Sequence, residues 1–130
     1  MTGEREIRVK LFKKLRDFGL AVSLHPQVFD LAIKINGHPY GIELKTPHMP
    51  STWMGVKKLY FGKDQAIRQA EIAETWNLIP VLIICDREKF FVIENYLDIV
   101  INYQTNYKTK EIPVEIFPKI KPLDEWLKNL

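Results

Sequence analysis

Three charged side chains interrupt two otherwise apolar runs in residues 28–46, VFDLAIKINGHPYGIELKT: Asp30 in the first run, Glu43 and Lys45 in the second. The intervening Asn36-Gly37 predicts a β-hairpin with a two-residue turn. In that register Asp30 faces Glu43 at a pair without mutual hydrogen bonds, where Cα atoms approach to about 4.5 Å. Lys45 projects from the same face. The hairpin therefore predicts two carboxylates and one ammonium group in a single cluster.

Opposed carboxylates repel each other, so this cluster needs a compensating interaction. One interpretation is that Lys45 neutralises the pair, or that the charges simply point into water. The other is a divalent cation between the carboxylates. Two hard oxygen ligands from the protein, with waters completing the shell, describe a Mg²⁺ site of the kind used in phosphoryl transfer. There Lys45 would contact the attacking water or the charge that develops on phosphorus.

The other face of the hairpin is predicted to be apolar along both strands, which we expect over residues 28–35 and 40–46. Side chains alternate between the two faces of a strand. The apolar face then collects Phe29, Leu31, Ile33, Ile35, Tyr40, Ile42 and Leu44. This pattern buries one side of the sheet and leaves the charged cluster on the other.

Helical spacing of apolar residues predicts a helix on each side of the hairpin. Residues 4–18 form the first, with Thr2 as N-cap and Gly19 as stop, and its apolar stripe is Ile7, Leu11, Leu15 and Phe18. Residues 64–76 form the second, in which small side chains permit close packing on the sheet: Ala66, Ala70 and Ala73.

The remaining elements follow from shorter patterns. Strands are predicted at residues 20–25, 79–85, 87–93 and 112–117, and a terminal helix at 123–130. Residues 46–63 are expected to be irregular, and residues 95–103 are ambiguous. A strand, a helix and a strand after the hairpin imply a parallel crossover. The predicted fold is α/β (α+β): a mixed β-sheet flanked by helices, in the order α-β-β-β-α-β, as one domain over residues 1–130.

These residues resemble the PD-(D/E)XK nuclease superfamily. FDLAIKINGHPYGIELKTP is similar to its motif region, with Asp30 as the motif Asp and Glu43-Leu44-Lys45 as (D/E)-X-K, the only such triplet in the chain. The resemblance covers residues 4 to about 85. Phe29 stands where the superfamily often has Pro. Small archaeal Holliday junction resolvases and viral-type replication-repair nuclease modules look most similar.

The resemblance implies a restriction-endonuclease-like core and a site. Asp30, Glu43 and the main-chain carbonyl of Leu44 would bind Mg²⁺ or Mn²⁺, and Lys45 would be the catalytic lysine. The implied activity is metal-dependent hydrolysis of DNA phosphodiesters, for example in junctions or flaps. The implied partners are DNA and a second copy of the chain, with no membrane and no small-molecule cofactor beyond the metal.

Two further catalytic candidates lie on the predicted helices. Many superfamily members add a glutamate from the first helix. Glu4 lies in the apolar stripe and can turn toward the sheet, whereas Glu6 points away; a carboxylate in the first turn also favours the helix dipole. On the second helix Gln65 resembles a glutamine that contacts substrate or orders the site, and its alternative is an ordinary polar residue near a helix start.

Candidate nucleic-acid contacts are basic residues and aromatics around this cluster. Basic side chains next to exposed aromatics suit backbone contact and base stacking. The candidates are Arg8, Trp53, Lys57, Lys58, Lys63 and Arg68, with Tyr60 and Phe61 among the aromatics. The alternatives are solvated charges and, for the aromatics, a dimer surface or a small second core.

Composition and the charged N-terminus indicate a soluble globular protein. With 46% hydrophobic and 27% charged residues, the 130-residue chain has the balance of a soluble globular protein. The charged start MTGEREIRVK predicts an intracellular, cytoplasmic protein, which a virus or plasmid could encode. Cys85 lies in an apolar run and is expected to be buried. The functional alternatives to a nuclease are a non-catalytic nucleic-acid-binding protein and a structural or assembly protein.

Overall fold

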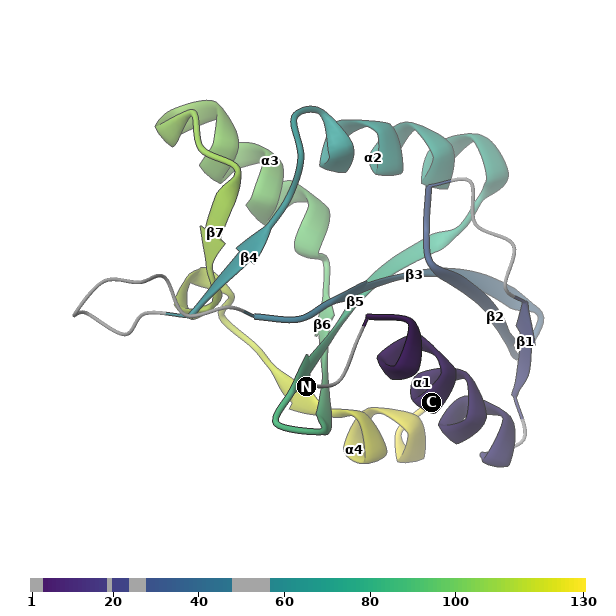
Figure 1. The fold of residues 1–130 in the computed structure, drawn as a ribbon. Helices are drawn as coiled ribbons and strands as arrows, with labels where there is room; N and C mark the ends of the chain where they lie inside the picture. The colour runs from purple at the N-terminus through teal and green to yellow at the C-terminus, as the bar shows by residue number, and fades with distance from the viewer. Residues whose placement is uncertain (1–3, 19, 24–27, 48–56) are drawn as a thin grey trace.

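The computed structural model describes residues 4–18, 20–23, 28–47 and 57–130, and its central feature is a six-stranded mixed sheet. The strand order is β1-β2-β3-β5-β6-β8. A separate two-stranded sheet pairs β4 with β7 (Figure 1). The strands are β1 (Ala21–Ser23), β2 (Leu31–Ile35), β3 (His38–Lys45), β4 (Lys58–Tyr60), β5 (Ile79–Asp86), β6 (Lys89–Glu94), β7 (Glu111–Pro113) and β8 (Lys121–Pro122).

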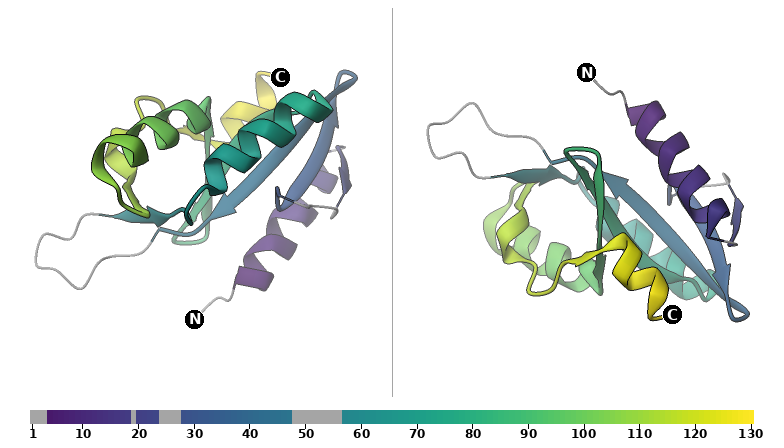
Figure 2. Two further views of the ribbon diagram at one scale, coloured as in Figure 1. Left: turned by 90° about the horizontal axis from the view of Figure 1, so that it is seen from above. Right: turned by 90° about the horizontal axis from the view of Figure 1, so that it is seen from below.

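Helices cover both faces of the six-stranded sheet. On one face lie α1 (Glu4–Asp17) and α4 (Leu123–Lys128). On the other lie α2 (Gln65–Trp76) and α3 (Tyr96–Tyr107), together with the small β4-β7 sheet (Figures 1 and 2). A 3-10 turn, Val114–Ile116, follows β7. The predicted fold class is therefore confirmed, and the described helices include none that is long and apolar enough to cross a bilayer.

Two hydrophobic clusters stabilise the two layers. The α1 and α4 face is built on Leu11, Leu15, Ile42 and Ile83, all fully buried, and it also contains Cys85 as predicted. The α2 and α3 face is built on Leu59, Phe61, Leu82 and Tyr96. At about 25 cal/mol per Å² of buried apolar surface, these clusters are the main favourable contribution to folding.

The β2-β3 hairpin has the predicted turn and register. Asn36 and Gly37 both have positive φ, 51° and 82°, as a type I′ turn requires. Leu31 pairs with Ile42 and Ile35 with His38. Parallel pairing of β3 with β5 confirms the predicted crossover.

Asp30 differs from the prediction, because β2 begins only at Leu31 and residues 28–30 form a bend. The bend also moves Phe29 off the apolar face. Its ring lies over Gly41, whose absent side chain would point to the same face as Glu43. Only a glycine leaves room for this ring, so the bend depends on a close contact between Phe29 and Gly41.

Other local predictions need correction. Phe18 is 48% exposed and follows the helix instead of completing its stripe. The stretch 46–63 is not wholly irregular, since it contains β4, and residues 112–117 contain only the end of β7 before the 3-10 turn. The ambiguous residues 95–103 belong to helix α3. Thr2 and Gly19, the proposed helix boundaries, lie outside the described residues.

We expect Gly41→Ala to destabilise the protein by about 1–3 kcal/mol, because overpacking a tight contact forces neighbouring groups to move. An ideal Cβ at Gly41 would lie 2.8 Å from Cδ2 of Phe29. Urea denaturation measures the change. Gly62→Ala is the matched control, since a Cβ there meets nothing within 4 Å. Equal stability of the two variants would contradict the packing argument.

Candidate active site

Asp30 is held against β3 by its main chain and its carboxylate. Its N–H donates to the carbonyl of Ile42 at 2.8 Å, and its Oδ2 accepts the N–H of Leu44 at 2.9 Å. Because these two residues flank Glu43, Asp30 is bonded to the chain on both sides of the second carboxylate. The bend at residues 28–30 thus replaces the ladder position predicted from sequence, and the two acidic residues still lie together.

The Glu43 side chain is buried and fully hydrogen-bonded. It is only 5% exposed. Because Glu is rarely buried unless its carboxylate has partners, both oxygens need groups that bond to them. Its Oε1 accepts Nε2 of Gln69 at 2.8 Å, and its Oε2 accepts Nε2 of Gln65 at 3.3 Å. Lys45 Nζ lies 3.4 Å from the same Oε2. Burial first, and the negative charge of Asp30 second, raise the pKa of Glu43 to about 7.

Lys45 is oriented by a polar and an aromatic neighbour. Besides its ion pair with Glu43, its Nζ donates to Oε1 of Gln65 at 3.2 Å. The ring of Phe61 lies below the ammonium group, 4.5 Å from Nζ to the centroid, which is cation–π distance. Phe61 is fully buried, so it does not offer the exposed stacking surface predicted for it. Its buried ring instead limits where the ammonium group can move.

Gln65, at the start of α2, links the catalytic candidates of β3. Its amide nitrogen donates to Glu43, while its amide oxygen accepts Lys45 and the N–H of Gly62, the latter at 3.1 Å. Gln65 is the residue of the second helix that is predicted to contact substrate or order the site. The structure joins Glu43, Lys45 and Gln65 by hydrogen bonds and an ion pair, and Asp30 bonds to the main chain of Leu44 beside them.

A second glutamine, Gln69, and Tyr96 form a buried chain behind Glu43. Tyr96 donates its hydroxyl to Oε1 of Gln69 at 2.6 Å. That bond turns the Gln69 amide nitrogen toward Glu43 and toward the carbonyl of Val28, 3.1 Å away. Both Gln69 and Tyr96 are 0% exposed. Gln69 therefore bridges the strand that carries Glu43 and the bend that carries Asp30.

Burial keeps Tyr96 protonated and able to donate. Removal from water, with smaller contributions from Glu43 and Asp30, raises its pKa well above the usual value. Sequence analysis assigned no role to Gln69 or Tyr96. Helical spacing places Gln69 on the same face as Gln65, one turn later, but indicates no partner for it. No local pattern indicates Tyr96, which comes from the segment with ambiguous secondary structure.

Arg8, a predicted nucleic-acid contact, lies beside Asp30 in this site, and its side chain is 37% exposed. Its Nη2 is 3.2 Å from Oδ1 of Asp30, so helix α1 contributes a positive charge from the far side of the cluster. Glu6 is exposed, as predicted for the side of the helix that points away. Glu4 begins α1, but its side chain lies outside the described residues, as does Trp53.

The remaining basic candidates surround the site at different depths. Lys57 forms an ion pair with Asp86, at the end of the neighbouring strand β5. Lys58 begins β4 and is half-buried. Lys63, two residues before α2, and Arg68, in the first turn of α2, are exposed. Lys63 and Arg68 thus fit the predicted contact with an anionic partner, while Lys57 already has an acidic partner within the protein.

The carboxylates fit a hard divalent cation in their chemistry. The described residues contain no group of three or more His, Cys, Asp or Glu side chains that could hold a metal. A cation here would be bound by two carboxylates, a main-chain carbonyl and water. Oε1 of Glu43 and both carboxylate oxygens of Asp30 have one donor each among the described residues, so each can accept a further contact. Burial first and Asp30 second raise the pKa of Glu43 to about 7, and a nearby cation would favour the charged form.

Comparison with solved structures shows which known folds this chain resembles. The Holliday junction resolvase Hjc of Archaeoglobus fulgidus matches with a TM-score of 0.66 and 14% identity, over 95% of this chain and 94% of that one. A bacterial homing endonuclease matches with a TM-score of 0.52 and 16% identity, over 86% and 75% of the two chains. The chain has the fold of these nucleases. Family models and curated proteins give no match to the sequence.

The nuclease fold extends beyond the region predicted from sequence. The resemblance to PD-(D/E)XK nucleases is confirmed for the fold, and the likeness to the resolvase covers 95% of the chain instead of ending near residue 85. The C-terminal third, which supplies Tyr96, is therefore part of the shared architecture. At this level of identity the likeness shows the fold, and the roles of individual residues remain predictions.

The raised pKa of Glu43 predicts a pH-dependent stability. Its pKa rises from 4.5 to about 7, so between these values the folded state holds a proton that the unfolded state releases. Stability from this group is complete below the lower value and lost as the pH rises through the upper one. In EDTA, thermal melts of the wild type should show this loss. Glu43→Gln should lack it, and parallel curves would contradict the assignment.

Tyr96→Phe should destabilise the protein by about 1–3 kcal/mol, because it leaves the buried Oε1 of Gln69 without its donor. Urea denaturation measures the loss. Tyr103→Phe is the matched control: it removes a hydroxyl from the same helix, and that hydroxyl has no hydrogen bond to the described residues. Equal effects of the two changes would mean that the Tyr96 bond contributes nothing specific.

Proposed function

We propose that this protein is a Mg²⁺- or Mn²⁺-dependent DNA nuclease that hydrolyses a phosphodiester bond. The observation that carries the proposal is one cluster: Glu43, Lys45 and Gln65 bond to one another, and Asp30 bonds to the Leu44 main chain beside them. It lies in a fold shared with a junction resolvase and a homing endonuclease. A protein that only binds DNA has no evident use for a buried carboxylate beside a second one.

Asp30 and Glu43, with the main-chain carbonyl of Leu44, would hold the cation. When bound, such a metal lowers the pKa of a water molecule and stabilises charge on a phosphoryl oxygen. The chain's own contribution is to fix the ligands: Leu44 and Arg8 orient Asp30, and Gln69 orients Glu43. Preorganised ligands need no rearrangement during the reaction.

Lys45 supplies the positive charge that the two carboxylates cannot. Gln65 and the ring of Phe61 hold its ammonium group beside Glu43. We propose that Lys45 contacts the attacking water or the negative charge that develops on phosphorus. Because it is only 15% exposed, water screens its charge weakly.

The proposed substrate is DNA, in a branched form such as a four-way junction or a flap. Hjc is a Holliday junction resolvase, and this chain spans 94% of it. Symmetric cleavage of a junction needs two active sites, so the proposal includes a homodimer. We propose that the protein acts inside the cell, because its proposed substrate is DNA.

Asp30→Asn and Lys45→Ala should each lower the rate of plasmid nicking about a hundredfold or more, because each removes charge from the reacting centre. The assay uses supercoiled plasmid with Mg²⁺ or Mn²⁺, and then a panel of labelled junction, flap, single-stranded and duplex DNAs. Asp98→Asn, which removes an exposed carboxylate in α3, is the control and should cut like the wild type.

The outcomes of this assay separate the possible functions. Wild-type protein that binds DNA but cuts none of the panel in either metal would be a non-catalytic binding protein. If the Asp30→Asn variant cuts as fast as the wild type, the assignment of Asp30 to the active site is wrong.

Metal binding has its own readout. Mg²⁺ or Mn²⁺ should raise the melting temperature of the wild type, since a ligand that binds only the folded state stabilises it. The increase should be much smaller for Glu43→Gln, and an equal increase in both proteins would show that the metal binds elsewhere.

A further inference from the structure

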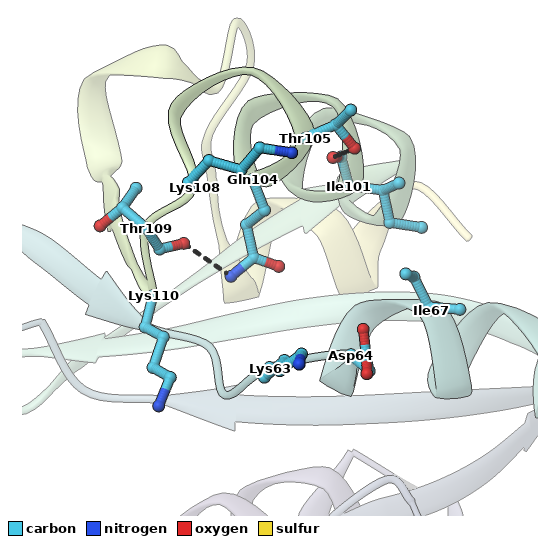
Figure 3. Close-up of a pocket in the computed structure, with 9 residues that line it drawn as sticks. All are labelled: Lys63, Asp64, Ile67, Ile101, Gln104, Thr105, Lys108, Thr109 and Lys110. Atoms are coloured by element: carbon cyan, nitrogen blue, oxygen red, sulfur yellow. Dashed lines mark hydrogen bonds between the residues drawn. The ribbon is translucent and has the colours of Figure 1, made fainter.

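A pocket of about 390 Å³ lies between the start of α2 and the end of α3, outside the group of catalytic candidates. We call it the lysine pocket. Figure 3 shows Lys108 on one side, Lys63 and Lys110 on the other, and the amide of Gln104 between them. Its lining residues are Lys63, Asp64, Ile67, Ile101, Gln104, Thr105, Lys108, Thr109 and Lys110.

The lysine pocket is joined to the candidate active site by the segment before α2. The N–H of Phe61 donates to the carbonyl of Lys110 at 2.8 Å, and Nε2 of Gln104 donates to the carbonyls of Phe61 and Thr109 at 3.1 and 3.0 Å. Two residues later, Lys63 lines the pocket. The Phe61 ring contacts Lys45. One short segment therefore borders both sites and holds them at a fixed separation.

The groups around the pocket favour an anion. Lys63, Lys108 and Lys110 are exposed, and none forms an ion pair with another described residue. Lys57 and Lys121, by contrast, each contact a carboxylate. Oγ1 of Thr109 accepts the N–H of Glu111 at 3.1 Å, which leaves its hydroxyl hydrogen for a ligand. Asp64 is the single carboxylate in the lining, against three ammonium groups.

We infer that the lysine pocket binds backbone phosphates of the nucleic-acid strand that extends from the candidate active site. The choice of ligand rests on the proposed nuclease function. Lysines act as point charges for phosphate, and their long side chains follow a backbone without reading its sequence. The pocket's separation from the active site by one short segment suits successive phosphates of a strand better than a single small anion.

The test is DNA binding measured without cleavage. Fluorescence anisotropy with a labelled four-way junction and with its linear duplex, in EDTA and at several salt concentrations, gives the affinity and its salt dependence. Lys108→Ala combined with Lys110→Ala should weaken binding about tenfold and lower the slope of log K against log salt by about two. Arginine at both positions should retain the wild-type affinity, because it keeps the charges.

The matched control is Lys119→Ala combined with Lys128→Ala, which removes two exposed lysines from the C-terminal region outside the pocket. If the pocket and control variants bind alike, or if the wild type binds no DNA, the inference is wrong. Its failure is distinguishable from failure of the proposed function. Loss of binding in the pocket variant of a protein that cuts nothing supports the pocket and overturns the nuclease.

Discussion

The buried Glu43 carboxylate is the constraint on which the rest of the site depends. Taking a carboxylate out of water is costly, and the cost is recovered only if every oxygen has a partner. Gln65, Gln69 and Lys45 provide these partners. Helix α2 must therefore pack over β3 with one rotation about its own axis and one position along that axis, because both glutamines must reach Glu43. The layer that packs against the sheet is consequently also the layer that builds the site.

Local sequence patterns determine the hairpin and the two layers, so these could be predicted. Asn36-Gly37 sets the turn, and alternation of apolar side chains then places Glu43 and Lys45 on one face. The stripe of Ile7, Leu11 and Leu15 packs as expected. Asp30 was placed beside Glu43 correctly but in the wrong backbone conformation, because no local pattern reports that Phe29 crosses to the other face over Gly41.

Contacts between residues far apart in the chain account for what could not be predicted. Tyr96 reaches Gln69 from a helix whose own sequence was ambiguous, and β4 exists only because β7 pairs with it. The sequence indicates Arg8 as a nucleic-acid contact and gives no sign of its ion pair with Asp30, which depends on how α1 packs on the sheet. In each case the deciding partner belongs to another element of the fold, more than 20 residues away in the chain.

The bonds from Asp30 to Ile42 and Leu44 tie the chemistry to the alignment of two strands. Sliding β2 along β3 by one residue would turn its apolar side chains outward and move the aspartate away from the glutamate in the same step. A misaligned hairpin would lose its buried apolar face together with the approach of the two carboxylates. The placement of the two carboxylates thus depends on the same strand alignment that buries the apolar face of the hairpin.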